Sequence, residues 1–453
     1  MRWYWKVIIG VFATVILGAN ALFTWVDRTP FQDRKEYQQT ISVLNRYYEY
    51  RDITPQDSLK IGWAQLSLIP QQDIQTIPLA GYGARKPKEA ESIHDSVNVK
   101  TIVISTSETK IALVSAELLI IHPEVALGVY RHLEKHGWSS SDIYFGATHS
   151  HSSIGGWAPG ITGDLIAGTH QTELTRFIST QIANSILIAE NNLSVGTFSF
   201  AEIESPTYIR NRLVGNKGII DPHLKVLVFR NEQGSAIDIT YGAHATCLGP
   251  QWKKVAGDYP YLLTESIERD SIYELASFRA GAVASMGTGP SDQSQMELAN
   301  WMSVGIKEEL SLLQMLPPTP FPKASIESYK IPLYLGDPQL KISTNLCLRP
   351  WLFRQLVGEY PVDIAVASIG EVLMVGLPCD FSGELAMPLY QYARERGITL
   401  IINSFNGGYI GYIPKDEWYD LNKYETRSMA WYGHDMGAYV SDLIIKIIDH
   451  HKK

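Results

Sequence analysis

Several short apolar segments that end in polar side chains suited to catalysis constrain the fold most strongly. Segments rich in β-branched and apolar residues alternate with patterns of helical period, which indicates sheets covered by helices. The five endings are DIYFGAT before His149, AIDITYGA before His244, AGAVASMG before residues 291–294, EVLMVGLP before Asp380, and LIINSF before Tyr409 and Tyr412. Because sites in such sheets form at the carboxyl ends of strands, these side chains are expected to converge.

Three further segments carry clear secondary-structure signals. KTIVIST and KIALVSAELL predict a hairpin of strands, and PEVALGVYRHLEKHG predicts a helix that ends at Gly137. TELTRFISTQIANSILIAE predicts a helix with one apolar face, made of Leu174, Phe177, Ile178, Ile182 and Ile186. No internal repeat or Pro-, Gly- or Ser-rich linker divides the 453 residues. We therefore predict a single α/β or α+β domain with mixed β-sheets flanked by helices.

The first 26 residues differ from the rest of the chain. Arg2 and Lys6 precede an uncharged run, residues 7–26, that is long enough to span a bilayer. It is either a retained signal anchor with its positive end inside, or a signal peptide cleaved near the small-residue site at 19–21. Both alternatives predict export, with the protein either membrane-anchored and facing outside the cytoplasm or secreted.

Residues 27–60 are polar and tyrosine-rich with some helical pattern, and we expect them to connect the N-terminal segment to a domain at 61–453. That domain has the composition of a folded protein, since 45% of the chain is hydrophobic and 19% is charged. A net charge of −8 without a basic stretch argues against nucleic-acid binding. Membrane association is expected through residues 7–26.

Cysteine usage limits the kinds of metal site that the chain can build. The three cysteines, Cys247, Cys347 and Cys379, allow at most one disulfide and no thiolate cluster. Any metal ligands must therefore be histidine, carboxylate or phenolate side chains.

The stretch GATHSHSSIGGW carries the main metal signal. Residues i and i+2 of a strand point to one face, so His149 and His151 are expected to share one space. Imidazole suits zinc, and His244 in YGAHATC could supply another ligand. The alternative is structural: one of the paired histidines bonds Thr148 or a loop carbonyl, and a lone histidine such as His244 is more often a core residue.

These motifs resemble those of the neutral ceramidases, zinc-dependent amidases that hydrolyse the N-acyl bond of ceramide. GATHSHSSIGGW is similar to the histidine motif of that family, and LAGYGARKPKEAESIHDSV to its Gly-Tyr motif. RNRLVGNKGIIDPHLKVLVF and YGAHATCLGPQWKKVAGDYP resemble its Asn-Arg segment and its second histidine segment. The resemblance runs from about residue 78 to residue 453, and the family's immunoglobulin-like C-terminal domain is expected to be absent.

The resemblance implies a role for each matching residue. The implied zinc ligands are His149, His244, Asp380 and Tyr412. His151 would lie beside the nucleophile, Arg212 would face the scissile carbonyl, SDQSQM would place the nucleophile at Ser294 after Asp292, and Tyr424 would be the active-site tyrosine.

Two departures from the family pattern stand out. Asp380 replaces a glutamate and is one methylene shorter, so Glu384 is a possible substitute ligand. The nucleophile motif lacks its Gly and Pro, so the turn that presents Ser294 is expected to differ.

Each residue also has a structural alternative. Ser294 could be a helix N-cap, with Glu297 completing a capping box. Arg212 could pair with a surface carboxylate, Asp380 could cap the following helix, and Tyr412 and Tyr424 could be core residues.

The sequence thus predicts a zinc-dependent amidohydrolase that acts on ceramide or a similar N-acyl lipid at a membrane surface, releasing a fatty acid and an amine. Arg212 and Tyr424 would stabilise the oxyanion, and a base such as His151 would activate Ser294. The alternatives are an amidase for a different N-acyl substrate and a non-catalytic lipid-binding envelope protein that retains the fold. A phosphoesterase would need a second metal and more carboxylates than the sequence offers near the histidines.

Overall fold

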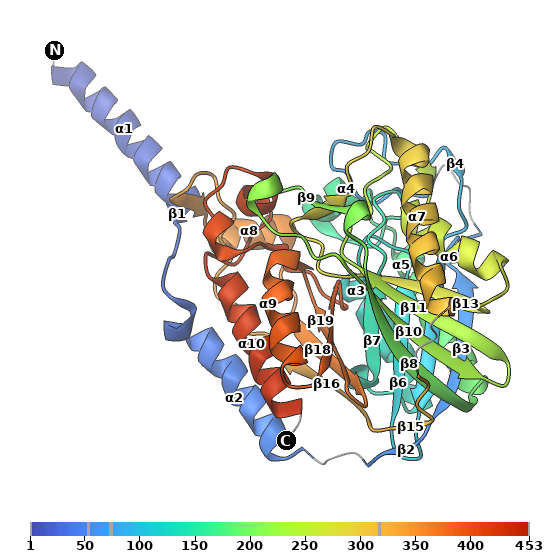
Figure 1. The fold of residues 1–453 in the computed structure, drawn as a ribbon. Coiled ribbons are helices and arrows are strands. Elements are labelled where there is room, and N and C mark those ends of the chain that lie inside the picture. Colours follow the sequence, from blue (N-terminus) through green and yellow to red (C-terminus); the bar gives the residue numbers. More distant parts are fainter. Residues whose placement is uncertain (1, 52–54, 72–75, 316–318, 452–453) are drawn as a thin grey trace.

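Two β-sheets lie face to face in the computed structural model of this chain, with helices on their outer sides (Figure 1). The structure describes residues 2–51, 55–71, 76–315 and 319–451. Residues 1 and 52–54, which belong to the predicted N-terminal segment and connector, lie outside the described residues.

The larger sheet has the strand order β13-β11-β10-β8-β3-β5-β6-β7. Its neighbours are antiparallel except for two parallel pairs, β11 with β13 and β6 with β7. The hairpin predicted at KTIVIST and KIALVSAELL is confirmed as β5 and β6. The bounds are β3 (Lys60–Ser67), β5 (Asn98–Ser105), β6 (Lys110–Ala116), β7 (Ile143–Ala147), β8 (Ser194–Glu204), β10 (His223–Asn231), β11 (Gly234–Tyr241) and β13 (Leu275–Ala280).

The smaller sheet has the order β16-β18-β19-β21 and packs its inner face on the larger one. Side chains such as Ile102 and Leu113 from the larger sheet meet Ala367, Met374 and Ile401 from the smaller sheet in one buried cluster. Because both faces of the central strands are covered, strands such as β5, β7 and β19 are buried along almost their whole length. The bounds are β16 (Ile326–Pro332), β18 (Asp363–Ile369), β19 (Val372–Leu377) and β21 (Thr399–Ser404).

Helices cover the outer faces of both sheets, which confirms the predicted α/β fold with mixed sheets flanked by helices. The predicted apolar face of α5 (Thr172–Asn191) is buried at Leu174, Ile178, Ile182 and Ile186, and Phe177 packs against the same core. The larger sheet carries α3 (Pro123–Leu133), α5 (Thr172–Asn191), α6 (Asp258–Arg269) and α7 (Gln295–Met315), and the smaller carries α2 (Lys35–Glu49), α9 (Gly383–Arg394) and α10 (Met436–His451).

The helix predicted to end at Gly137 is also confirmed, with a tighter last turn. After α3, a 3-10 turn covers Glu134–His136, and Gly137 follows with a φ of +73°. Glycine adopts this left-handed backbone without the steric cost that a Cβ would add.

Two short helices and several short strands surround the carboxyl ends of the central strands. The helices are α4 (Gly160–Ala167) and α8 (Pro350–Val357), which pack on each other. At this end of the molecule β4 (Ser92–Ile93) pairs with β12 (Lys254–Val255), β9 (Ile209–Asn211) with β14 (Met286–Thr288), and β20 (Asp380–Phe381) with β22 (Tyr412–Ile413). A further short pair, β2 (Asp57–Ser58) with β15 (Lys323–Ala324), lies at the opposite end (Figure 1).

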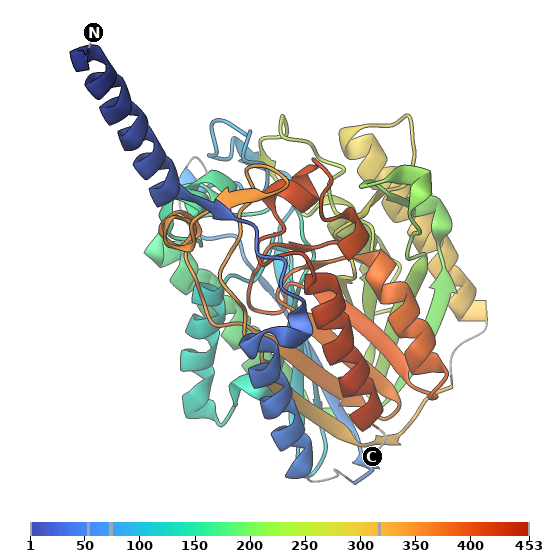
Figure 2. The same ribbon diagram turned by 90° about the vertical axis from the view of Figure 1, so that its left-hand side faces the viewer.

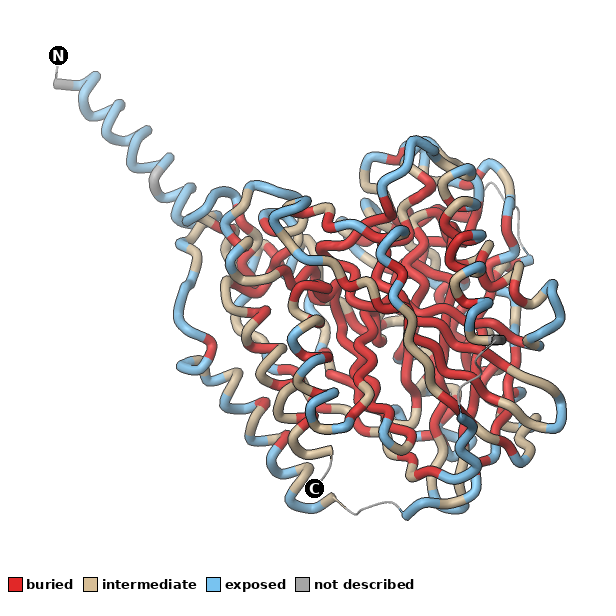
Figure 3. Tube along the Cα trace, viewed as in Figure 1, coloured by how far each residue is buried: buried red, intermediate tan, exposed pale blue. Residues whose placement is uncertain are grey.

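The N-terminal helix α1 (Arg2–Leu22) stands out from the body (Figures 1 and 2). Its segment from Trp3 to Leu22 is long and apolar enough to cross a membrane, a property that a signal sequence shares. The residues of this segment whose burial is described are exposed (Figure 3). Strand β1 (Phe23–Trp25) follows directly and pairs with β17 (Leu346–Leu348). The chain then continues into α2, whose Thr40 and Leu44 are buried against the body.

Candidate functional site

Three histidine rings meet in a buried cluster at the carboxyl ends of β7 and β11. His151 Nε2 lies 3.2 Å from His149 Nε2 and 3.1 Å from His244 Nε2. The predicted strand geometry of the pair is wrong, because β7 ends at Ala147 and His149 has a φ of +63°. This left-handed turn, rather than strand alternation, brings the two rings together.

Backbone contacts orient the histidines. His149 Nδ1 lies 2.7 Å from the Leu119 carbonyl, and its ring stacks on Phe405 with centroids 4.0 Å apart. An Nδ1–H that donates to this carbonyl leaves Nε2 unprotonated and facing the cluster, the arrangement usual for a metal-bound histidine. His244 Nδ1 lies 3.5 Å from the Val283 carbonyl, so the Nε2 atom of His244 faces the cluster as well.

A carboxylate and a phenol complete the cluster. Asp380 Oδ1 lies 3.4 Å from His149 Nε2, and it is a buried oxygen without a hydrogen-bond partner among the described residues. Its Oδ2 accepts a 2.8 Å hydrogen bond from the Tyr409 hydroxyl. The parallel pairing of β20 with β22 sets Asp380 opposite Tyr412. Glu384 instead lies in the first turn of α9, where it accepts a hydrogen bond from Trp418.

Burial controls the charge of these groups. It lowers the pKa of His149 to about 3 and those of His151 and His244 well below the ordinary value. It raises the pKa of Asp380 to about 7. Neutral imidazoles and a carboxylate with an unsatisfied oxygen are the donor set that a divalent metal ion prefers, and its charge would offset the desolvation of Asp380. The residues present therefore fit a metal ion.

Arg212 and Tyr424 lie beside the cluster. Arg212 Nη2 donates a 3.2 Å hydrogen bond to the Tyr412 hydroxyl, and its Nε lies 3.1 Å from Glu425 Oε1. The Tyr424 ring lies 6.0 Å from that of Tyr412 and is half exposed. The guanidinium group of Arg212 and the phenol of Tyr424 thus face the same space as the histidines.

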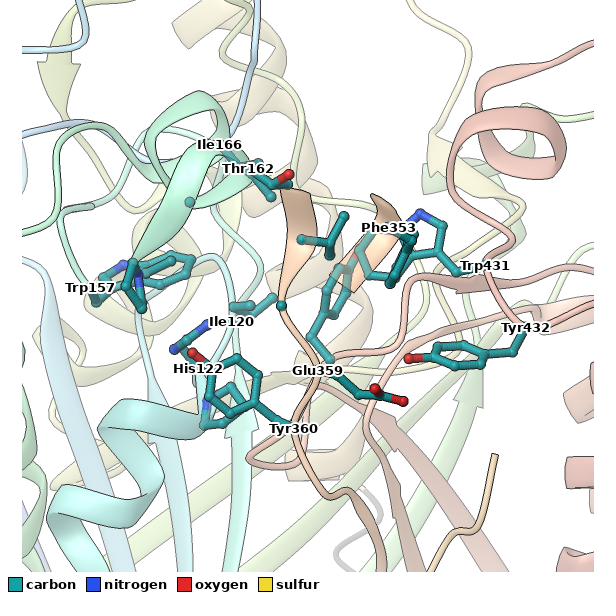
Figure 4. Close-up of a pocket in the computed structure, with 17 residues that line it drawn as sticks. Ile120, His122, Trp157, Thr162, Ile166, Phe353, Glu359, Tyr360, Trp431 and Tyr432 are labelled. Carbon is teal, nitrogen blue, oxygen red and sulfur yellow. The ribbon is translucent and has the colours of Figure 1, made fainter. Parts of the chain in front are cut away.

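That space is a cavity of about 960 Å³, large enough for a lipid-sized ligand. His151, His244, Arg212, Tyr412 and Tyr424 line it, whereas His149 and Asp380 lie beneath its wall. A smaller pocket of about 50 Å³ adjoins it and shares four of its lining residues: Thr162, Ile166, Val357 and Trp431 (Figure 4). Trp157, Tyr360 and Tyr432 make this second pocket largely aromatic.

The structure does not bring Ser294 to the cluster. The segment AGAVASMG is mostly a loop and not the predicted strand, since β13 ends at Ala280 together with its partner β11 at Tyr241. Ser294 and Asp292 are exposed, and neither is among the residues that line the cavity. Ser294 directly precedes α7, as its alternative role at a helix start requires. The segment is tied to the His244 loop by Gln295 Oε1, which accepts a 3.3 Å hydrogen bond from Gly249 N.

Several functional contacts were not found from the sequence. The sequence places Tyr409 after a predicted strand, and its hydrogen bond to Asp380 follows only from the fold. Arg85 is buried and donates to the His151 carbonyl at 2.8 Å. Gly81, in the Gly-Tyr motif, has a φ of +109°, and a Cβ there would lie 2.4 Å from the His151 carbonyl oxygen. Of these contacts, only the approach of Gly81 to the His151 backbone has a signal in the sequence, because that position requires glycine.

Comparisons with known proteins agree with the resemblance. Residues 72–286 match the family model described as neutral/alkaline non-lysosomal ceramidase, N-terminal. A search of curated protein sequences finds no match. The solved neutral ceramidase from Pseudomonas aeruginosa superposes with a TM-score of 0.76 at 16% identity, over 89% of this chain and 75% of that one. A ceramidase complexed with C2 gives 0.73 at 17% identity, over 87% and 75%. At this identity the superpositions show a shared fold.

Proposed function

We propose that this chain, which matches the neutral ceramidase family over residues 72–286, is a zinc-dependent amidohydrolase of ceramide or a similar N-acyl lipid. The products would be a fatty acid and an amine. The observation that carries the proposal is the 960 Å³ cavity, which has His151, His244, Arg212 and Tyr424 on its wall.

The proposed metal ligands are His149, His244, Asp380 and Tyr412. The unpartnered Asp380 oxygen and the inward-facing Nε2 atoms support this assignment. Imidazole and carboxylate donors suit zinc, and a zinc ion here would polarise the amide carbonyl.

The side chains on the cavity wall have distinct proposed roles. Arg212 and Tyr424 donate to the oxygen on which negative charge develops as the carbonyl is attacked. His151, kept neutral by burial, accepts the proton of the attacking hydroxyl and passes it to the departing nitrogen. A C–O bond to the attacking hydroxyl forms and the amide C–N bond breaks, which releases the amine. Where that hydroxyl belongs to Ser294, water then attacks the acyl ester with His151 as the base, which releases the fatty acid and restores the serine.

The nucleophile is proposed at Ser294 from the family resemblance alone. Its exposed position outside the cavity wall favours a second candidate, a non-catalytic lipid-binding protein that keeps the metal and the fold. An amidase with a different N-acyl substrate is a further candidate, because Asp380 and the altered nucleophile segment both depart from the family pattern.

We also propose the division into an N-terminal anchor or signal peptide at 1–26, a connector at 27–60 and a hydrolase domain at 61–453. The apolar, exposed helix α1 supports the first part and an exported location for the domain.

Metal analysis combined with an amidase assay tests the proposed function. The full chain, purified in detergent, should hold about one zinc and release fatty acid from a fluorescent ceramide until a chelator is added. His149→Ala should lose both the zinc and the activity, because an inward-facing ligand is removed. Ser294→Ala should lose activity and keep the zinc.

Each departure from that pattern has a defined meaning. Zinc retained in His149→Ala contradicts the ligand set. Full activity in Ser294→Ala removes that serine from the mechanism. Zinc without fatty-acid release from ceramide or other N-acyl lipids favours the non-catalytic candidate.

A further inference from the structure

The end of α1 is fixed to the body beside the cavity. Strand β1 pairs with β17 from Phe23 to Trp25, and Arg349 N donates a 2.9 Å hydrogen bond to the Leu22 carbonyl. Trp351 Nε1 donates a 3.0 Å bond to the Ala21 carbonyl, and Arg349 Nε bonds the Asn20 carbonyl. Figures 1 and 2 both show α1 leaving the body next to β1. These bonds set the direction in which the helix leaves.

The elements around this exit are also part of the cavity wall. Trp351 lies at the start of α8, and Val357 at its end lines the cavity. Helix α8 packs on α4, where the Thr162 hydroxyl donates a 2.7 Å hydrogen bond to the Leu356 carbonyl. Ile342 lies just before β17 and lines the cavity as well, and its N bonds the Leu346 carbonyl at 2.8 Å. The exit of α1 and the cavity mouth therefore share one face of the molecule.

Large apolar side chains are exposed on that face. They are 40–75% exposed and come from four separate segments: Trp25, Ile161, Leu165, Ile342 and Trp351. Asp164 also lies on α4, but its carboxylate accepts a hydrogen bond from His170 N. The exposed cations Lys423 and Arg427 line the cavity nearby. Exposed apolar side chains with aromatic and basic neighbours are typical of surfaces that lie in a membrane interface.

We propose that these five side chains form a membrane-contact surface, through which the body lies on the bilayer that α1 enters and opens its cavity toward the lipid. The occupant is a phospholipid surface because the same face carries the membrane-length helix, whose exit is set by β1 and its hydrogen bonds. Ile161 and Leu165 of α4 enter the interface, and the basic groups of Lys423 and Arg427 reach the lipid phosphates. An N-acyl lipid then enters the cavity without crossing bulk water.

The inference rests on the proposed role of α1 as an anchor, and on the proposed function only for the identity of the lipid that enters. A test that needs no turnover keeps the two apart. The variants Ile161→Cys and Trp25→Cys of the full chain each carry a fluorescent label on the added thiol, since the three natural cysteines are buried. The protein is reconstituted into vesicles of phosphatidylcholine and phosphatidylglycerol, with or without nitroxide-labelled phosphatidylcholine.

Two further positions serve as controls. Phe12→Cys reports on α1 itself. Val195→Cys is equally exposed, but it pairs with Lys60 next to β2, at the end of the body away from α1 (Figure 1). The natural chain, treated with the same label, measures the background fluorescence from its own three cysteines.

We expect the nitroxide lipid to lower the fluorescence at 161 and 25 about twofold and to leave that at 195 unchanged. Quenching at 12 without quenching at 161 and 25 overturns the surface and leaves the anchor. Equal quenching at 161 and 195 also overturns it, because the contact would then be non-specific. An inactive protein that shows the expected quenching pattern supports the surface and contradicts only the proposed function.

Discussion

At the scale of single residues, the site combines groups that are costly to bury. Asp380 has a raised pKa and one unsatisfied oxygen, and it is held in place by Tyr409 and by the pairing of β20 with β22. The backbone pairing brings this shorter carboxylate to within 3.4 Å of His149, so Glu384 is not needed to reach the cluster. A buried carboxylate is retained at such a cost where a cation or a proton compensates it.

Replacing Arg212 tests whether the proposed catalysis can be separated from the proposed metal binding. Arg212→Gln should lower kcat about 100- to 1,000-fold, because the donor proposed for the developing oxyanion is lost. The zinc content should stay unchanged, since Arg212 contacts Tyr412 but is not itself a ligand. Turnover of fluorescent ceramide and metal analysis measure the two effects.

Arg210→Gln is the matched control for this variant, because Arg210 lies two residues away on β9 and is exposed. Its activity should equal that of the natural chain. A loss of zinc in Arg212→Gln would mean that the arginine holds the ligands rather than the transition state.

At the scale of elements, α2 shows how the predicted connector is packed. Its Leu44 is buried in the core of the smaller sheet, and Thr40 shares a 2.7 Å hydrogen bond with the hydroxyl of Tyr439 on α10. Tyr37 on the same helix donates a 2.7 Å bond to Asp442. These contacts join the segment after α1 to the body, and they make the helix a covering layer of the sheet.

Leu44→Ala tests whether α2 stabilises the body. Removing a fully buried leucine should lower the free energy of unfolding by about 2–5 kcal/mol. Gln39→Ala, on the exposed face of the same helix, should change it by less than about 0.5 kcal/mol. Denaturant unfolding of the full chain in detergent measures both. Equal effects of the two substitutions would mean that α2 is only a spacer.

At the scale of the whole molecule, the sheets bury charged groups behind the site. Glu117 is fully buried after β6, where its Oε2 accepts a 2.7 Å hydrogen bond from Asn98 N and its Oε1 lies 3.9 Å from Lys100 Nζ. Burial raises its pKa from 4.5 to about 7. The folded protein therefore binds a proton at this site more tightly than the unfolded chain does.

This raised pKa predicts how stability varies with pH. The stabilisation from the Glu117 proton is fully present below pH 4.5 and is lost as the pH rises to about 7. One pKa unit corresponds to about 1.4 kcal/mol, so the loss is on the order of 3 kcal/mol. Glu117→Gln cannot ionise, so its Tm should fall less than that of the natural chain as the pH is raised from about 4 to about 7.5. Parallel Tm curves for the two proteins would show that Glu117 ionises normally in the fold.

The sequence by itself determined the fold class, the main helices and strands, and the residue types of the site. Apolar periodicity depends on local order in the chain, so the hairpin of β5 and β6 and the helices α3 and α5 could be predicted. The predicted strand endings and a family resemblance were enough to propose His149, His244, Asp380 and Tyr412 as metal ligands.

Only the tertiary structure decided how these side chains meet. The left-handed backbone of His149, the bond from Tyr409 to Asp380 and the exposed position of Ser294 depend on contacts between segments far apart in the chain. The bonds that hold α1 beside the cavity join residues more than 300 positions apart. Such contacts leave no periodic signal in the sequence, because they arise where the loops of two packed sheets come together.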